Sequence, residues 1–350
     1  MKNGKKQLKV FVAVIVVTVL LNFVSCIFPT SGNSPEYGVR TAFFDLDDGV
    51  WDQERVESAI TLIADSGTAV FSGNLTEEII RHIRNTLEYW SGKIALDFRE
   101  CTGLDYLPGR AFRYCKNLTS IMIPSNVTYI GWDAFSCCSS LTSIVIPSSV
   151  MSIGDGVFGN CIGLTNLTIP SSVREMGDYV FNGCNSLAAI TVDIGNEWYK
   201  DINGVLFSKD EKILYCYPHE KKETSYAIPS SVTDIENGAF SYCSGLTEIT
   251  LPSNLTNIGS GAFYGCSGLT SIAIPPSVRS IGSSAFSDCS GLTELTIPPS
   301  VTTVVNDVFS GCSGLTELTI PSSVSTVMSY AFSGCSGLTT LTIQSGVRNI

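Results

Sequence analysis

The chain has 350 residues, of which 44% are hydrophobic and 15% are charged, so it has enough apolar material for a packed core and is not a disordered protein. Its formal net charge is −11, and beyond the first ten residues it has no sizeable cluster of Lys and Arg, which argues against binding to DNA or RNA. The abundance of Ser, Thr and Gly predicts many short strands and turns rather than long surface helices.

Residues 1–25 have the pattern of an export signal peptide. An apolar run extends from Val10 to Leu21 with Thr18 as its one polar residue, and four lysines precede it, at Lys2, Lys5, Lys6 and Lys9. A basic segment followed by an uncharged apolar segment is the pattern that export machinery recognises. The sequence therefore predicts that the rest of the chain lies outside the cytoplasm.

The apolar run ends in Phe23-Val24-Ser25-Cys26, which resembles the lipobox of bacterial lipoproteins with Phe23 in place of the usual Leu. This resemblance implies that Cys26 carries a lipid and anchors the chain to a membrane. Plain secretory cleavage and an uncleaved membrane anchor are the alternatives, because Val10 to Phe28 nearly reaches the ~20 residues that a membrane helix needs. In each case residues 26–40, which include many Ser, Pro and Gly, are expected to form a flexible tether.

Residues 41–100 precede the repeats and are predicted to form a small α/β cap. Thr68 to Phe71 has the composition of a strand, Thr76 is placed to begin a helix, and Ile94 to Phe98 alternates as a second strand. The helix would have one apolar face, formed by Ile79, Ile80, Ile83, Leu87 and Trp90. This unit is expected to cover the open end of the first repeat, since the terminal units of a solenoid need a different outer face.

Residues 101–350 contain a 23-residue repeat. Cysteines recur at this interval in two runs, and phenylalanines, leucines and prolines recur with them; the cysteines are Cys115, Cys138, Cys161, Cys184, Cys243, Cys266, Cys289, Cys312 and Cys335. The unit from Cys266 to Ser287 has six large apolar side chains, which stabilise by ~9–18 kcal/mol if fully buried. Ordering its residues costs about 1.5 kcal/mol each, so a single unit cannot fold alone. The units must stack, with strands paired in parallel ~4.8 Å apart.

The repeated pattern Cys-x-x-Leu-x-x-Ile-x-Ile-Pro-x-x-Val-x-x-Ile-Gly-x-x-Ala-Phe resembles the BspA-type leucine-rich repeats of bacterial and protist surface proteins. The resemblance covers about residues 101–350. It implies a leucine-rich repeat solenoid with a parallel β ladder. It also implies an adhesin-like surface protein that engages host matrix proteins, other cells or the envelope of its own cell.

The repeat is interrupted between Cys184 and Cys243, whose separation exceeds two repeats by about half a repeat. The extra length falls between Asp193 and Pro229, where two apolar stretches flank a polar turn at Lys209 and Asp210. This pattern predicts a protruding β-hairpin insertion at about residues 194–226.

The cysteine column is expected to consist of buried thiols that donate weak S–H hydrogen bonds to loop carbonyls. Disulfides between successive turns are the alternative, but nine is an odd number and every bridge would need the same geometry. Cys101, Cys137 and Cys216 are expected outside the column. No Cys-x-x-Cys pair is present, so a zinc site is not expected.

No catalytic motif is found in the sequence. His82 and His219 are the two histidines, and both are expected to be surface residues rather than general bases. Asp45, Asp47 and Asp48 before Gly49 lack the full spacing of a calcium loop. The sequence therefore predicts a protein that is not an enzyme and that has no cofactor and no metal.

The side chains of the strands that point away from the core are the predicted binding face. In the C-terminal repeats these are threonines edged by carboxylates: Thr247, Glu248, Thr270, Thr293, Glu294, Thr316, Glu317 and Thr339. The alternative is that Thr favours strands and Glu keeps the surface soluble. A second candidate set consists of aromatic residues expected to be exposed, Tyr129, Trp132, Tyr179, Trp198, Tyr199 and Phe207.

Adhesion to a host extracellular matrix or cell-surface protein is the function that the sequence favours. A structural envelope scaffold that binds copies of itself is the alternative, because the sequence ends in mid-repeat without a polar cap and has low charge.

Overall fold

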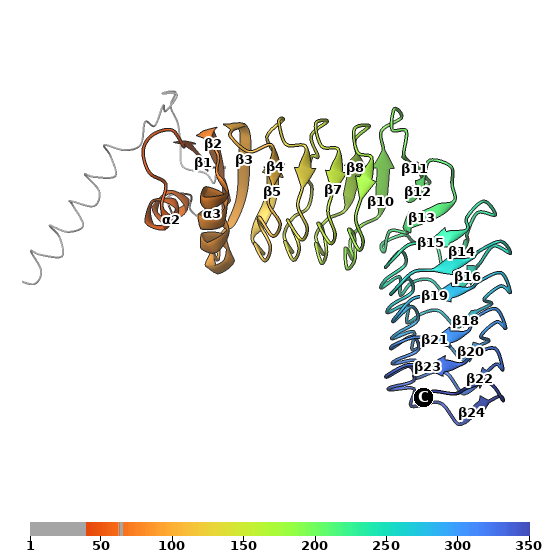
Figure 1. The fold of residues 1–350 in the computed structure, drawn as a ribbon. Helices are drawn as coiled ribbons and strands as arrows, with labels where there is room; N and C mark the ends of the chain where they lie inside the picture. Colours follow the sequence, from red (N-terminus) through yellow and green to blue (C-terminus); the bar gives the residue numbers. More distant parts are fainter. Residues whose placement is uncertain (1–39, 62, 64–65) are drawn as a thin grey trace, which may run out of the picture.

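The computed structural model describes residues 40–61, 63 and 66–350, which form a solenoid of short parallel strands (Figure 1). The signal peptide, the tether before Arg40 and Cys26 lie outside these residues, so the predictions about them stay predictions. Neither α2 nor α3, the helices of the described part, is long and apolar enough to cross a bilayer. The predicted solenoid with a parallel ladder is confirmed.

The N-terminal region contains β1 (Arg40–Asp45), α2 (Gln53–Thr61), β2 (Ser66–Asn74), α3 (Glu77–Tyr89) and β3 (Lys93–Thr102). The hydroxyl of Thr76 accepts a hydrogen bond from the Ile79 N–H at 3.3 Å, which caps α3 as the sequence predicted. The predicted strand, helix and second strand all form, whereas β1 and α2 were missed.

This N-terminal region continues the ladder rather than forming a separate layer. Strands β1, β2, β3 and β5 (Leu118–Met122) are neighbours in one parallel sheet. Arg40 pairs with Gly67, and Ser66 pairs with Lys93, so these two turns have equal length and are longer than the later repeats. The predicted cap is therefore two longer turns of the solenoid in which a helix replaces the loop.

Most 23-residue turns contribute a first strand and a second strand; the turn that contains Val145 has only an isolated bridge, to Met122, in place of the first. The first strands after β5 are β8 (Asn166–Ile169), β10 (Ala189–Val192), β14 (Ser225–Ala227), β16 (Glu248–Thr250), β18 (Ser271–Ile272), β20 (Glu294–Leu295), β22 (Glu317–Ile320) and β24 (Thr340–Ile343). The second strands are β4 (Tyr106–Leu107), β6 (Tyr129–Ile130), β7 (Ser152–Ile153), β9 (Glu175–Met176), β15 (Asp234–Ile235), β17 (Asn257–Ile258), β19 (Ser280–Ile281), β21 (Thr303–Val304) and β23 (Thr326–Val327).

The core is built from columns of equivalent side chains. Phe263 and Phe286, at the same position of successive turns, stack with their ring centroids 5.3 Å apart and an interplanar angle of 6°. Both rings are completely buried. A second column runs through the N-terminal turns, where Phe71 stacks on Phe98 at 5.0 Å. Stacking of identical turns thus gives the shared interior that a single repeat lacks.

The loop after each second strand packs tightly on the preceding turn. A Cβ atom added to Gly282 would lie 2.4 Å from the Ser260 nitrogen, closer than any real contact. Glycine at residue 282 therefore lets the backbones of these two turns nearly touch. Two residues in most loops have a positive φ, as Ser284 (56°) and Asp288 (57°) do in this turn.

The interruption of the repeat lies at the bend of the molecule in Figure 1. We call residues 40–192 the N-terminal arm and residues 225–350 the C-terminal arm. Between them, β11 (Tyr199–Ile202), β12 (Val205–Ser208) and β13 (Ile213–Cys216) form an antiparallel meander, and β13 then pairs in parallel with β15.

The predicted β-hairpin forms, since β12 and β13 pair antiparallel on either side of Lys209 and Asp210, but the expectation that it protrudes is wrong, because β12 is buried along its whole length. Leu206 packs into the core of the N-terminal arm, whereas Val205 and Phe207 pack into the core of the C-terminal arm. The strand is apolar on both faces because each face covers one arm. The insertion therefore separates the two cores.

Candidate binding surface and the corner cavity

The predicted binding face lies on the first strands of the C-terminal arm, and all eight of its predicted residues are exposed. We call it the strand face; it consists of Thr247, Glu248, Thr270, Thr293, Glu294, Thr316, Glu317 and Thr339. Parallel pairing aligns equivalent residues of neighbouring turns, as with Glu248, Ser271 and Glu294 on β16, β18 and β20. The structure thus brings these side chains together in two adjacent rows.

The threonine row has a structural role in the ladder. The Thr270 hydroxyl donates to the Thr247 carbonyl at 3.2 Å, and the Thr270 N–H donates to the same oxygen at 3.2 Å. Thr293 and Thr339 repeat this hydroxyl bond to the preceding threonine, at 3.3 and 3.1 Å. Each of these threonines therefore adds a side-chain hydrogen bond between successive turns while the residue itself remains exposed.

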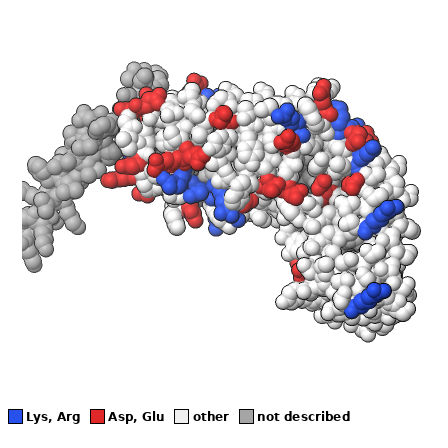
Figure 2. All heavy atoms as spheres, viewed as in Figure 1, with Lys and Arg blue, Asp and Glu red and all other residues white. Residues whose placement is uncertain are grey.

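The carboxylate row has no cationic partners within the described residues. Glu294 and Glu317 occupy equivalent positions in successive turns, an arrangement in which like charges repel. From residue 244 to residue 350 the sequence contains five carboxylates and two cations, Arg279 and Arg348. Figure 2 shows that charged side chains are sparse over the C-terminal arm and gather on the N-terminal arm and at the bend.

Four residues of the aromatic set are exposed as expected, including Tyr179 at 36%. Tyr129, Trp132 and Trp198 are 37%, 45% and 43% exposed. Tyr199 and Phe207 are buried in the meander, so they cannot contact a partner. The exposed aromatic residues lie on second strands and loops, and they form no part of the strand face.

The cysteines are free thiols, and no disulfide joins any of the twelve cysteines from Cys101 to Cys335. The Cys266 thiol donates to the Phe240 carbonyl at 3.1 Å, and Cys289 repeats this bond to Phe263 at 3.0 Å. Burial raises the pKa of both thiols well above the usual value. Cys216 was expected outside the column, yet it lies near enough to Cys243 for its charge to raise the pKa of that thiol further.

Neither histidine is a surface residue, contrary to the expectation. The Nδ1 atom of His82 lies 3.2 Å from the Trp51 carbonyl, and the side chain is 13% exposed. Both ring nitrogens of His219 are buried without a well-formed hydrogen bond. Burial lowers the pKa of His219 to about 4. Sequence reasoning failed here because an isolated histidine in a polar segment carries no periodic signal of burial.

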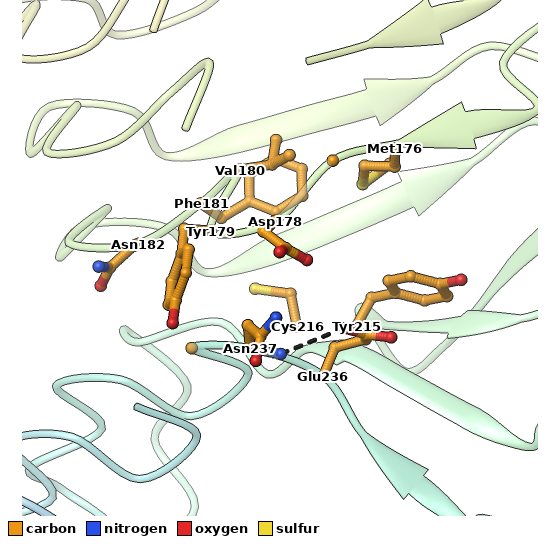
Figure 3. Close-up of a pocket in the computed structure, with 12 residues that line it drawn as sticks. Met176, Asp178, Tyr179, Val180, Phe181, Asn182, Tyr215, Cys216, Glu236 and Asn237 are labelled. Carbon is orange, nitrogen blue, oxygen red and sulfur yellow. Dashed lines mark hydrogen bonds between the residues drawn. The ribbon is translucent and has the colours of Figure 1, made fainter. Parts of the chain in front are cut away.

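A cavity of about 120 Å³ lies at the bend between the two arms (Figure 3). Residues 176–182 form its N-terminal wall, and residues 215–216 and 236–238 form the opposite wall. The Tyr179 hydroxyl donates to the Ser260 carbonyl at 3.2 Å and so links the two arms. We call this site the corner cavity. Sequence reasoning identified Tyr179 as an exposed aromatic residue but gave no indication of the cavity.

Two carboxylates, Asp178 and Glu236, line the corner cavity. The Glu236 side chain accepts a hydrogen bond from the Asn237 N–H at 3.2 Å (Figure 3). Burial raises the pKa of Glu236, and the nearby carboxylates of Asp178 and Asp234 raise it further. The pKa of Tyr215 is also raised, by burial and then by the charge of Glu236.

The comparisons with known proteins agree with this architecture. The family profile described as BspA type leucine rich repeat region matches residues 105–215 and 211–339. The search of curated protein sequences finds no match to this chain.

Several solved structures resemble the chain. A leucine-rich repeat protein from Eubacterium ventriosum is 29% identical, with 77% of this chain and 78% of that chain covered and a TM-score of 0.62. A leucine rich cell surface protein from Faecalibacterium prausnitzii is 25% identical, with coverage of 90% and 86% and a TM-score of 0.67. The pneumococcal vaccine antigen PcpA, at 23% identity, 79% coverage of both chains and a TM-score of 0.54, shares the fold. With more than half of its length matched by the profile, the chain belongs to the family of BspA-type leucine-rich repeat proteins.

Proposed function

We propose that this chain is a cell-surface adhesion protein that binds a host extracellular matrix or cell-surface protein through the strand face. The observation that carries the proposal is the exposed double row of threonines and carboxylates on parallel strands of the C-terminal arm. A rigid, flat row of this kind presents equivalent groups at regular intervals to a protein partner. The similar protein from Faecalibacterium prausnitzii is described as a cell surface protein, which supports the location.

The proposal predicts that charge reversal on the strand face weakens capture of a partner. Glu248, Glu294 and Glu317 should be replaced together by Lys, and binding to immobilised collagen, laminin and fibronectin should be measured by surface plasmon resonance. We expect at least a tenfold loss of affinity for the matrix protein that the wild-type chain binds, because the carboxylate row faces that partner.

A matched control reverses three exposed charges at the other end of the molecule. Glu54, Glu57 and Glu88 lie on α2 and α3, and their replacement by Lys changes the net charge by the same amount. This variant should bind like the wild type. Equal binding by both triple variants would place the partner site elsewhere on the molecule.

Self-association is the second proposal, and one observation favours it. Charged side chains are sparse over the C-terminal arm (Figure 2), so little repulsion between like charges opposes the approach of a second copy of the chain. Sedimentation of residues 40–350 over a range of concentrations tests this proposal, and a monomer at the highest concentration contradicts it.

Membrane attachment through a lipid on Cys26 is part of the adhesion proposal. Residues 1–25 would be removed as the signal peptide, and residues 26–40 would connect the lipid to the solenoid. Incorporation of labelled palmitate into the wild-type chain, and its loss in Cys26→Ala, is the expected result.

A further inference from the structure

The corner cavity exists because the ladder of loops is broken at the bend. In two turns, the second residue after the second strand accepts a hydrogen bond from the next turn through its side chain. Asp155 Oδ1 accepts from the Asp178 N–H at 2.9 Å, and Asn237 Oδ1 accepts from the Ser260 N–H at 2.6 Å. Asp178 occupies the equivalent position at the end of the N-terminal arm, where the meander replaces the next regular turn. Its carboxylate is therefore free to face the cavity, as Figure 3 shows.

Glu236 occupies the position that glycine holds in the neighbouring turns. A Cβ at Gly177 would lie 2.6 Å from the Asp155 nitrogen, and one at Gly259 would lie 2.7 Å from the Asn237 nitrogen. Later turns also carry side chains at this position, Val305 and Met328. At the bend, the side chain at this position is a half-buried carboxylate, that of Glu236, and it lines the cavity.

The charges around the cavity are not balanced. Its twelve lining residues include Asp178 and Glu236 but no Lys, Arg or His. Asp234 adds a third negative charge close to Glu236. The cation nearest in sequence, Arg174, does not line the cavity, and two lysines of the meander pair with carboxylates, Lys200 with Glu211 at 2.6 Å and Lys212 with Asp210 at 3.8 Å. A half-buried carboxylate among like charges is unfavourable until a cation binds beside it.

The walls of the cavity identify the kind of cation. The rings of Tyr179 and Tyr215 stand on opposite sides of the carboxylates (Figure 3). Aromatic rings attract organic cations through their negative faces, and they can lie against the methylene groups of a long side chain. No group of three His, Cys, Asp or Glu side chains suited to a metal ion occurs in the described residues. The volume of about 120 Å³ is also smaller than the ~300–1,000 Å³ of most small-molecule pockets.

From these observations we infer that the corner cavity is a docking site for a protein partner that inserts one lysine or arginine side chain between Tyr179 and Tyr215, with its charge against Asp178 and Glu236. The carboxylates supply charge complementarity, and the rings supply the walls for the alkyl part of the side chain. This site lies on the loops and second strands, so the inference does not depend on a role for the strand face.

The inference can be tested with a matched pair of blocked pentapeptides, Gly-Gly-Lys-Gly-Gly and the same peptide with norleucine in place of Lys. Each is titrated into ¹⁵N-labelled residues 40–350 at pH 7, and the amide signals of Tyr179, Tyr215 and Asn237 are followed by NMR. We expect saturable shifts with the lysine peptide and none with the norleucine peptide. Equal shifts with both peptides would overturn the inference.

Two isosteric variants, Glu236→Gln and Asp178→Asn, remove the charges and keep the shape. Each should raise the Kd of the lysine peptide at least tenfold, whereas Glu248→Gln on the strand face should leave it unchanged. A Kd that is unchanged in both cavity variants contradicts the inference. Displacement of the peptide by millimolar calcium chloride, with the same amide shifts, would identify an inorganic cation site instead. Binding of matrix proteins by Glu236→Gln and Asp178→Asn is measured as well, because it tests the strand face independently of the corner cavity.

Discussion

Single residues at the bend determine how the two arms meet, and His219 is the residue with the largest consequence for pH. Its ring lies near the backbone of Cys184 in the last turn of the N-terminal arm and near that of Ser241 in the C-terminal arm. Both ring nitrogens are buried without a well-formed hydrogen bond. The native structure therefore holds the imidazole in its neutral form.

We predict that His219 makes the protein less stable in acid. The folded pKa of about 4 lies below the ordinary value of 6.5, so between these values the unfolded chain binds a proton that the native chain does not. The free energy of unfolding is therefore unaffected by the titration of His219 above pH 6.5. It falls by about 3 kcal/mol in total as the pH is lowered from 6.5 towards 4. In His219→Gln, the free energy of unfolding in urea should fall less between pH 7 and pH 4 than in the wild type.

The control for this prediction is His82→Gln, which removes the other histidine. This variant should keep the acid sensitivity of the wild type. If both variants lose stability in acid as steeply as the wild type does, then carboxylates rather than His219 cause the effect.

A loop glycine gives a second prediction at the scale of one residue. The Gly282→Ala side chain would lie 2.4 Å from the Ser260 nitrogen and 2.6 Å from its Cα, so the backbones of two turns must separate. We expect a loss of about 1–3 kcal/mol, measured as a lower urea midpoint of the far-UV circular dichroism. Gly245→Ala is the control, because no atom lies within 4 Å of its added Cβ and its φ is not positive. Equal losses of stability in the two variants would show that the backbone preference of glycine, rather than contact between turns, causes the destabilisation.

At the scale of elements, the stacking of turns determines the chemistry of the cysteine column. We predict that iodoacetamide at pH 8 modifies Cys137 and Cys335 before the other described cysteines, because these two are half-buried and the others are buried. Burial raises the pKa of Cys266 and Cys289 so far that almost no thiolate forms. Mass spectrometry of digests taken over time gives the order of modification. Early modification of Cys266 in the native chain would contradict the packing of the column.

The elements of the regular repeat could be predicted from the sequence, because residues at the same place in successive repeats have the same surroundings in the fold. Phe263 and Cys266 each belong to a column whose members share the same contacts. Phe44, Phe71 and Phe98 are also evenly spaced, but at the longer interval of the N-terminal turns. Three residues supply only two such intervals, too few to stand out as a repeat, so β1 and α2 were missed. The helix α3 was found because its caps and apolar face are local signals.

The strand face could be predicted for the same reason as the core, since the residues between buried positions of a strand point outward. The corner cavity could not, because its two walls are distant in the sequence and meet only where the repeat is interrupted. One local signal was present in the sequence. Glu236 stands where Gly177, Gly259 and Gly282 stand in other turns, but Val305 and Met328 replace glycine in the same way away from the bend, so this signal does not single out the corner.

At the scale of the whole molecule, the described chain has two hydrophobic cores rather than one. The aromatic column of the N-terminal arm ends at Phe181, and that of the C-terminal arm begins at Tyr217, which stacks on Phe240 at 5.2 Å. The strand β12 lies between the cores and packs one face into each. Stability in a solenoid is approximately the sum of contributions from turns and from the contacts between neighbouring turns. The bend is therefore the natural boundary between two cooperative units.

We predict that the arms can be destabilised separately, and the tryptophans allow this to be measured. Three of the four tryptophans, Trp51, Trp90 and Trp132, lie in the N-terminal arm and Trp198 directly precedes β11, so their fluorescence reports mainly on the N-terminal arm, while far-UV circular dichroism reports on both arms. Phe286→Ala removes a fully buried ring from the C-terminal column and should cost about 3–5 kcal/mol. Its urea transition should begin earlier by circular dichroism, with little change in the tryptophan transition. Phe135→Ala, the equivalent change in the N-terminal arm, should move the tryptophan transition instead. If each variant moved both transitions equally, β12 would couple the two cores into a single unit, and the bend would be a rigid part of one solenoid.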